Sequence, residues 1–290
     1  MKGRRFWKMS GSGNDFIFFD AMREPAGSLA TPEVIGRLCE RRTGVGADGV
    51  VFLEPHASLA FMMRYFNRDG SLAEMCGNAA LCSTRLARDL GLVGHGDFAF
   101  ETVSGPVTGR FADGGPEIDM VPVTEMQSDF STDRIAHEGR IGYARVGVPH
   151  LVVLVDDVRD VDVERRGREL RLLPSLRDGA NANSVSRGPQ GSWTIRTYER
   201  GVEEETFACG TGAVATAALL TAWGLANGPV ALTTRSGRDL TARVPAMTAD
   251  YPGSGDIAPP SAAGRQGTRS APPVLRGEGR VVFEGFLGEF

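Results

Sequence analysis

The residues most informative about the fold are 207–223, which read FACGTGAVATAALLTAW. After Gly210, apolar residues occupy nearly the whole circumference of a helix, so this stretch predicts a helix over Gly210–Trp223 that is buried on every side. The most apolar stretch of the chain, Ala213–Ala226, is too short and too rich in threonine to span a bilayer. Because short β-like runs precede and follow it, we predict a small apolar helix enclosed by a sheet.

The same arrangement occurs earlier in the chain. Residues 74–90 read EMCGNAALCSTRLARDL and predict a second helix, Gly77–Leu90, with an apolar stripe. In both places a strand and an acidic turn come before Cys-Gly and the helix. Cys209 follows Cys76 by 133 residues (209 − 76), which is near half the chain. Two related domains that each contribute one cysteine explain this internal repeat.

Further elements are predicted around these helices. Thr31 and Pro32 are typical of an N-cap and the first position of a helix, which we expect to run through Arg42. Strands are predicted at 16–20, 49–53, 61–67, 97–103 and 117–121, and again at 141–146, 150–155, 192–198, 230–234 and 240–244. Residues 252–273 are rich in Pro, Gly, Ser and Ala and are predicted to be a mobile loop or insertion. We predict domains 1–122, to which a strand at 280–290 returns, and 123–279, which contains the insertion.

The composition excludes several classes of protein. A net charge of −4 over 290 residues indicates neither a nucleic-acid-binding nor a membrane-binding surface. Lys2 and Lys8 are the only lysines among 32 basic residues, and neither has the context that a pyridoxal-phosphate enzyme or a P-loop requires. Four cysteines are too few for a disulfide scaffold, and the four histidines have no metal-binding spacing. We expect a cytoplasmic protein, because the N-terminus lacks an apolar signal segment.

The two Cys-Gly pairs have a specific chemistry. A cysteine directly before a helix lies among unpaired backbone N–H groups, at the positive end of the helix dipole, which favours the thiolate. The amides that follow each cysteine, those of Gly77, Asn78, Gly210 and Thr211, can hold a carboxylate. Two such helix starts suit an amino acid whose α-carbon lies between two thiols. The other cysteines, Cys39 and Cys82, are predicted mid-helix among apolar residues and are interpreted as core residues.

With these features, the chain resembles the diaminopimelate epimerase family of cofactor-independent epimerases and racemases. The matching stretches are 8–16 (KMSGSGNDF), 43–49 (TGVGADG), 66–71 (FNRDGS), 74–78 (EMCGN), 198–201 (YERG) and 208–212 (ACGTG), in the family's order. The resemblance implies an α/β protein of the α+β type. It also implies two pseudo-symmetric domains, each a mainly antiparallel sheet or barrel around a central apolar helix, with the site in the cleft.

The resemblance further implies a mechanism. Cys76 and Cys209 are the acid–base pair: one thiolate removes the α-proton, and the other thiol delivers a proton to the opposite face, without pyridoxal, metal or nucleotide. His150 and Glu199 tune the pKa values of the cysteines. The implied substrate contacts are Asn14, Asn67, Asn181, Glu199 and Arg200, together with the helix-start residues named above. The family also implies a homodimer.

The sequence departs from the family pattern at three places, which leaves the substrate open. Val148 stands where the family has asparagine, Ala79-Ala80-Leu81 replaces Gly-Ala-Arg, and Gly11-Ser12-Gly13 varies the loop before Asn14. The leading hypothesis is the epimerisation of LL-diaminopimelate to the meso form, for lysine and peptidoglycan precursors. The alternatives are a racemase for another amino acid such as histidine, a dehydratase or isomerase without two-base inversion, and a thiol-redox binding protein.

Overall fold

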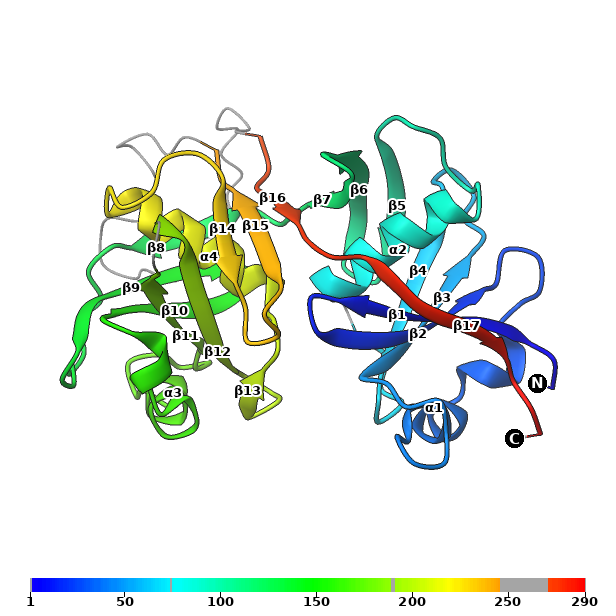
Figure 1. Ribbon diagram of the computed structural model, residues 1–290, viewed down its shortest axis with the longest axis horizontal. Coiled ribbons are helices and arrows are strands. Elements are labelled where there is room, and N and C mark those ends of the chain that lie inside the picture. Colours follow the sequence, from blue (N-terminus) through cyan, green and yellow to red (C-terminus); the bar gives the residue numbers. More distant parts are fainter. Residues whose placement is uncertain (1, 74, 189–190, 246–270, 290) are drawn as a thin grey trace. The chain divides into compact units, whose positions relative to one another are not determined.

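The computed structural model describes residues 2–73, 75–188, 191–245 and 271–289. It is mostly sheet, with strands β1 to β17 and helices α1 to α4 among these residues, so the predicted α+β class is confirmed (Figure 1). The chain divides into two compact units. The first contains Met1–Asp119, Ser236–Leu240 and Arg276–Phe290, and the second contains Met120–Arg235 and Thr241–Leu275.

The first unit is built around helix α2 (Gly77–Asp89), which packs against β1, β3, β4, β6, β7 and β17. Its strands are β1 (Arg5–Gly11), β2 (Asn14–Asp20), β3 (Gly49–Glu54), β4 (Met62–Asn67), β5 (Phe98–Thr102), β6 (Gly105–Ala112), β7 (Gly115–Asp119) and β17 (Arg280–Phe286). The short helices η1 (Gly27–Ala30) and α1 (Pro32–Cys39) contact each other, and α1 also contacts β3.

The second unit is built around helix α4 (Gly210–Ala222), which packs against β8, β9, β10 and β11. Gly210 and the run from Gly212 to Leu220 are buried, which confirms the predicted burial of this helix. The strands of this unit are β8 (Val123–Gln127), β9 (Glu138–Val146), β10 (Val148–Val155), β11 (Asn181–Arg187), β12 (Trp193–Glu199), β13 (Glu204–Thr206) and β14 (Val230–Thr233). Its other helices are η2 (Val158–Asp160) and α3 (Val163–Arg171), while β15 (Asp239–Arg243) and β16 (Val274–Arg276) hold residues of both units.

Both units pair their strands in the same order. In the first unit, β17–β1 and β1–β2 are antiparallel, β2–β3 parallel, β3–β4 antiparallel and β4–β5 parallel. In the second, β8–β9 and β9–β10 are antiparallel, β10–β11 parallel, β11–β12 antiparallel and β12–β14 parallel. Helix α2 follows β4, and α4 follows β12 after the short strand β13, so the predicted pseudo-symmetry is confirmed. Strand β17, from the end of the chain, has in the first unit the place that β8 has in the second.

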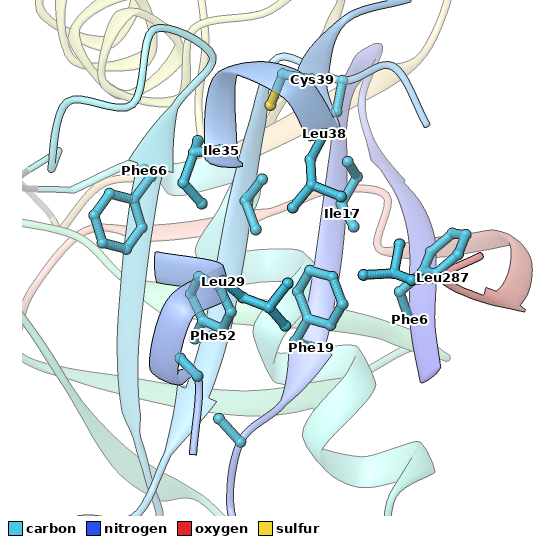
Figure 2. Packing of buried hydrophobic residues seen from close by; sticks show 14 residues of the cluster. Phe6, Ile17, Phe19, Leu29, Ile35, Leu38, Cys39, Phe52, Phe66 and Leu287 are labelled. Atoms are coloured by element: carbon cyan, nitrogen blue, oxygen red, sulfur yellow. The ribbon is translucent and has the colours of Figure 1, made fainter. Parts of the chain in front are cut away.

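The sheet of the first unit carries apolar side chains on both faces. Ile17 and Phe19 of β2 pack in one cluster with Ile35 and Leu38 of α1 (Figure 2). Side chains alternate along a strand, so the equally buried Phe16 and Phe18 point to the opposite face. Helix α1 covers the first face and α2 packs on the second, which explains why residues 16–19 of β2 are apolar without interruption.

Several predicted elements differ from the structure. Helix α1 ends at Cys39 rather than Arg42, because the chain turns back and the amides of Val45 and Gly46 bond to the Leu38 carbonyl. Cys39 is therefore the last residue of a helix, not a mid-helix residue, although it belongs to the core cluster. Strands β1, β6, β8, β11 and β13 and helix α3 were not predicted. Of the predicted insertion 252–273, residues 252–270 lie outside the described residues.

A glycine at the start of β3 makes a close backbone contact that we expect to be sensitive to substitution. Gly49 pairs with Asn67, and an added Cβ atom would overlap the Phe66 carbonyl oxygen and the Tyr65 ring. Gly49→Ala is therefore expected to lower the free energy of unfolding by about 1–3 kcal/mol in urea titrations. Gly94→Ala is the control, because nothing lies within 4 Å of a Cβ atom there, and it should change stability by no more than about 0.5 kcal/mol. Equal losses in the two variants would contradict the prediction.

Candidate active site

Helix α2 begins at one of the two predicted catalytic cysteines. Cys76 is its N-cap, with extended backbone angles (φ −139°, ψ 117°), and its thiol is half-buried. The Ala80 amide closes the first turn on the Cys76 carbonyl at 2.9 Å. The amides of Gly77 and Asn78 come before that bond, in the first turn of the helix.

A tight hairpin places Asn14 next to this helix start. Ser12 and Gly13 both have positive φ (55° and 109°) and join β1 to β2 as a two-residue turn, so that Asn14 is the first residue of β2. The Asn78 side chain donates from Nδ2 to Asn14 Oδ1 at 2.8 Å. Asn14 in turn donates from Nδ2 to Asp48 Oδ2 at 3.1 Å. The structure thus brings Asn14 and Asn78 together and fixes the orientation of the Asn14 amide.

Charged residues that the sequence analysis did not single out hold Asp48. Arg41 donates to Asp48 Oδ1 at 2.8 Å and makes two bonds of 2.9 Å to Asp15. Lys8 pairs with Asp15 at 2.7 Å and donates to the Gly46 carbonyl. Burial raises the pKa of Asp15, but the bonds and charges of Arg41 and Lys8 outweigh burial and hold this pKa below its usual value. Apart from Arg41, these residues lie within the stretches 8–16 and 43–49 that resemble the family.

Asn67 is the last residue of β4 and begins a turn. Its side chain donates from Nδ2 to Ser71 Oγ at 3.0 Å, and its backbone amide bonds to the Ser71 carbonyl at 2.9 Å. In the part of the chain that the structure describes, no hydrogen bond joins Asn67 to the Asn14–Asn78 pair. Its amide oxygen Oδ1 is therefore the group that can accept a bond from a ligand.

Helix α4 repeats the geometry of α2 in the second unit. Cys209 is the N-cap, again with extended angles (φ −126°, ψ 112°), and both helices have 13 residues. Its Sγ accepts from the Gly212 amide at 3.4 Å and lies 3.5 Å from Thr211 Oγ1. The Gly210 and Thr211 amides are in the first turn, where no carbonyl of the helix reaches them. Each unit therefore begins its central helix with a half-buried cysteine.

Two further predicted residues lie on neighbouring strands of the second unit, and a third, Arg200, follows the last residue of β12. His150 in β10 is the register partner of Asn181 in β11. Asn181 is buried, and its Oδ1 accepts from the Arg200 amide at 2.7 Å, which leaves the NH₂ group of this side chain for a ligand. The Arg200 guanidinium donates to the Asp178 carbonyl at 3.0 Å. The structure therefore brings His150, Asn181 and the backbone of Arg200 together.

Burial shifts the pKa values of the two predicted tuning residues in opposite directions: it lowers that of His150 and raises that of Glu199. His150 is fully buried, and this burial, with the charge of Arg200, lowers its pKa to about 3. Glu199 is the last residue of β12, and burial raises its pKa, while the Thr206 hydroxyl works against the rise. Both groups are thus shifted toward their neutral forms.

The positions that depart from the family pattern fall in different environments. Val148 is the first residue of β10, two positions before His150, and is half-buried. Leu81, in contrast, is completely buried in α2, and a Cβ atom at Gly277 would lie 3.0 Å from its side chain. The Leu81 side chain is therefore part of the core of the first unit. Among the described residues, no three His, Cys, Asp or Glu side chains form a group that could bind a metal ion.

Comparison with known proteins decides the family. The model of the diaminopimelate epimerase family matches residues 6–126 and 142–246, which include both cysteines and every predicted site residue. The chain belongs to the diaminopimelate epimerase family. The family resemblance and the prediction of an isomerase of the epimerase class are thereby confirmed.

Family members from distant organisms align over most of the chain. The diaminopimelate epimerase of Gemmatimonas aurantiaca is 44% identical over 284 residues, covering 97% of this chain and 98% of its own. The diaminopimelate epimerase of Aquifex aeolicus is 38% identical over 247 residues, which cover 81% and 88% of the two chains.

Solved structures of other proteins share the fold. A PhzF-family phenazine biosynthesis protein from Bacillus anthracis superposes with a TM-score of 0.73 at 14% identity and covers 99% of both chains. A hydroxyproline epimerase from Agrobacterium vitis superposes with a TM-score of 0.61 at 16% identity and covers 100% of this chain and 95% of its own. The fold of this diaminopimelate epimerase family member is therefore also found in proteins with other names. None of its described helices is long and apolar enough to cross a membrane.

Proposed function

We propose that the protein converts LL-diaminopimelate to meso-diaminopimelate with Cys76 and Cys209 as the two acid–base groups and without a cofactor. The observation that carries this proposal is the N-cap position of a half-buried cysteine on the central helix of both units. The names of relatives that align over most of the chain support the substrate. We propose further that the family's two domains are 1–122 with 280–290 and 123–279. The two compact units differ from these bounds, because 120–122 belong to the second unit and 236–240 and 276–279 to the first.

The proposed reaction needs a base and an acid on opposite faces of one α-carbon. One cysteine thiolate takes the α-proton, so that the C–H bond breaks and an S–H bond forms. The electron pair left on the α-carbon spreads into the substrate carboxylate. The amides at the two helix starts, those of Gly77, Asn78, Gly210 and Thr211, hold that carboxylate and stabilise its growing negative charge. The other cysteine then gives its thiol proton to the opposite face, which inverts the stereocentre and leaves a thiolate there.

The orientations of the side-chain amides support a division of roles at the distal end of the substrate. Asn181 uses its Oδ1 on the Arg200 amide, so it offers its NH₂ group to the distal carboxylate. Arg200 can make a bidentate pair with the same carboxylate. Asn67 uses its NH₂ group on Ser71, so it offers Oδ1 to the distal ammonium. Asn14 and Glu199 complete the proposed contacts, and His150 and Glu199 adjust the pKa values of the cysteines.

Incubation in deuterium oxide tests this function. The enzyme is incubated separately with LL-diaminopimelate, meso-diaminopimelate, L-histidine and other amino acids. The products are separated on a chiral column, and their deuterium content is measured by mass spectrometry. We expect deuterium at one α-carbon as the stereocentre inverts, and only with the two diaminopimelate isomers. Inversion of L-histidine alone would replace the substrate assignment, and the absence of α-proton exchange in every amino acid would overturn the epimerase proposal.

We also propose that the protein works as a cytoplasmic homodimer. Strand β17 supports a contact with a second copy, because three of its large apolar residues are exposed: Val282 (46%), Phe283 (48%) and Phe286 (69%). Light scattering should give about twice the chain mass of 31.0 kDa. Phe286→Asp should lower that mass toward one chain, whereas a monomeric wild-type protein would contradict the proposal.

A further inference from the structure

A chain of buried hydrogen bonds connects three strands of the second unit, β10, β11 and β12. Thr197 of β12 donates from Oγ1 to Asn183 Oδ1 at 3.0 Å. Asn183 of β11 lies 2.9 Å, through Nδ2, from the Leu151 carbonyl oxygen of β10, and 3.3 Å from His150 Nδ1. Asn183 and His150 are both completely buried. Neither Asn183 nor Thr197 was singled out from the sequence.

The backbone carbonyl fixes the orientation of the Asn183 amide. The Leu151 carbonyl can only accept a hydrogen bond, so the atom that faces it must belong to the NH₂ group. The Thr197 hydroxyl donates to the other end of the amide, which agrees with an oxygen there. Asn183 Oδ1 also lies so close to Gly212 of α4 that a Cβ atom there would overlap it. The side chain is held on both sides.

This orientation decides where His150 carries its proton. The NH₂ group has two hydrogens, of which one bonds to the Leu151 carbonyl and the other points to His150 Nδ1. Nδ1 must therefore supply a lone pair, and a neutral ring then has its proton on Nε2. We infer that Asn183 is a positioning residue that holds His150 as the neutral Nε2-protonated tautomer, so that His150 offers a hydrogen-bond donor and not a base.

The surroundings of His150 agree with this state. Burial, together with the charge of Arg200, lowers the pKa of His150 to about 3, so the ring stays neutral near pH 7. Its Nε2 is buried and has no hydrogen-bond partner among the described residues. A buried N–H group without a partner is costly, and a ligand or an anionic group that accepts its hydrogen bond would remove that cost.

The consequence for catalysis rests on the proposed function, whereas the tautomer does not. In a cysteine–histidine ion pair the imidazole takes the thiol proton and becomes an imidazolium. Here Nδ1 is occupied by the Asn183 amide and Nε2 already carries a proton, so the ring has no lone pair to accept another. The α-proton of the substrate therefore stays on a cysteine sulfur between removal and return, and His150 stabilises an anion by donation from Nε2.

The tautomer can be measured directly in the complete protein. Long-range ¹H–¹⁵N spectra of protein with ¹⁵N-labelled histidine distinguish a nitrogen that carries hydrogen from one with a lone pair, and His150→Gln identifies the signals. At neutral pH we expect Nε2 to carry the hydrogen and Nδ1 to have the lone pair. A hydrogen on Nδ1, or an imidazolium, would overturn the inference without any substitution at Asn183.

Substitution of Asn183 tests its role as the positioning residue. Asn183→Asp replaces the donor that faces Nδ1 by a carboxylate, which should move the hydrogen of His150 to Nδ1 or add a second proton. We expect kcat for diaminopimelate to fall about 10- to 100-fold, the value of one hydrogen bond to a charged group, with little change in KM. Asn227→Asp makes the same change on an exposed loop of the second unit and should leave both parameters unchanged.

The outcomes separate this inference from the proposed function. An unchanged His150 tautomer together with unchanged kcat in Asn183→Asp would overturn the role of Asn183. If Asn183→Asp does not fold, the wild-type spectrum still decides the tautomer, and Thr197→Val, which removes the donor to Asn183 Oδ1, should broaden or split the His150 signals. Failure of every amino acid to exchange its α-proton, with the expected tautomer observed, would overturn the function and leave the tautomer standing.

Discussion

Replacement of either Cys76 or Cys209 by alanine is expected to lower kcat for diaminopimelate epimerisation by about 10²- to 10⁴-fold, the usual contribution of a positioned acid or base. In a two-base inversion, the same cysteine is the base for one stereoisomer and the acid for the other. Loss of either thiol should therefore slow the reaction from both LL- and meso-diaminopimelate. Chiral chromatography of timed samples from each direction measures both rates.

The other two cysteines are the matched controls for this prediction. Cys39 and Cys82 are buried, and burial raises the pKa of Cys39 to about 12 and that of Cys82 well above its usual value, so both remain neutral thiols. Cys39→Ala and Cys82→Ala should lower the unfolding midpoint and leave kcat within about twofold of the wild type, since they remove core volume and no acid–base group. Full turnover by Cys76→Ala or Cys209→Ala would refute the two-base mechanism.

Arg166→Met is expected to lower the free energy of unfolding by about 3–5 kcal/mol, the range for a buried ion pair that loses one partner. Arg166 of α3 makes two bonds of 2.8 Å to the Glu138 carboxylate and one of 2.7 Å to the Asp133 carbonyl. The side chains of Arg166 and Glu138 are only 7% and 3% exposed. Without the guanidinium, the Glu138 carboxylate loses its charged partner in a site that water scarcely reaches. Urea unfolding followed by circular dichroism measures the loss.

A neighbouring arginine gives the control for Arg166. Arg165 lies on the same helix with a side chain that is 65% exposed, and its two ion pairs are 3.7 Å long. Arg165→Met should change the free energy of unfolding by no more than about 1 kcal/mol. The double variant Arg166→Met with Glu138→Leu should recover most of the stability, because it removes both charges. Similar losses for Arg165→Met and Arg166→Met would contradict a special role of the buried pair.

Weaker packing of α3 in Arg166→Met would also affect β12, a strand that carries a site residue. Gly167 of α3 packs so closely on Tyr198 of β12 that an added Cβ atom would overlap the tyrosine Cβ atom. The next residue of β12 is Glu199, one of the proposed site residues. We therefore expect Arg166→Met to lower activity at temperatures well below its unfolding midpoint. Activity that stays at the wild-type level up to global unfolding would show that the Glu199 region does not depend on α3.

Features that arise from neighbouring residues were predictable from the sequence. Apolar residues around the whole of Gly210–Trp223, and the placement of Cys-Gly before both central helices, depend on interactions within a few turns of one segment. The pseudo-symmetry followed from the spacing of those two segments. Helix α3 was missed because its sequence VERRGRELR is mostly charged, and the packing of only a few of its residues identifies it.

The sequence by itself therefore determined the family, the two-unit fold and the two cysteines at the starts of matched helices. Only the tertiary structure decided how the polar groups around them are oriented. The Asn14 amide is oriented by Asp48, 34 residues away, and the tautomer of His150 by Asn183, 33 residues away. The physical reason is that a helix pattern or an N-cap is made by residues close in sequence. The direction of a buried hydrogen bond, in contrast, depends on which distant strand supplies the opposing donor or acceptor.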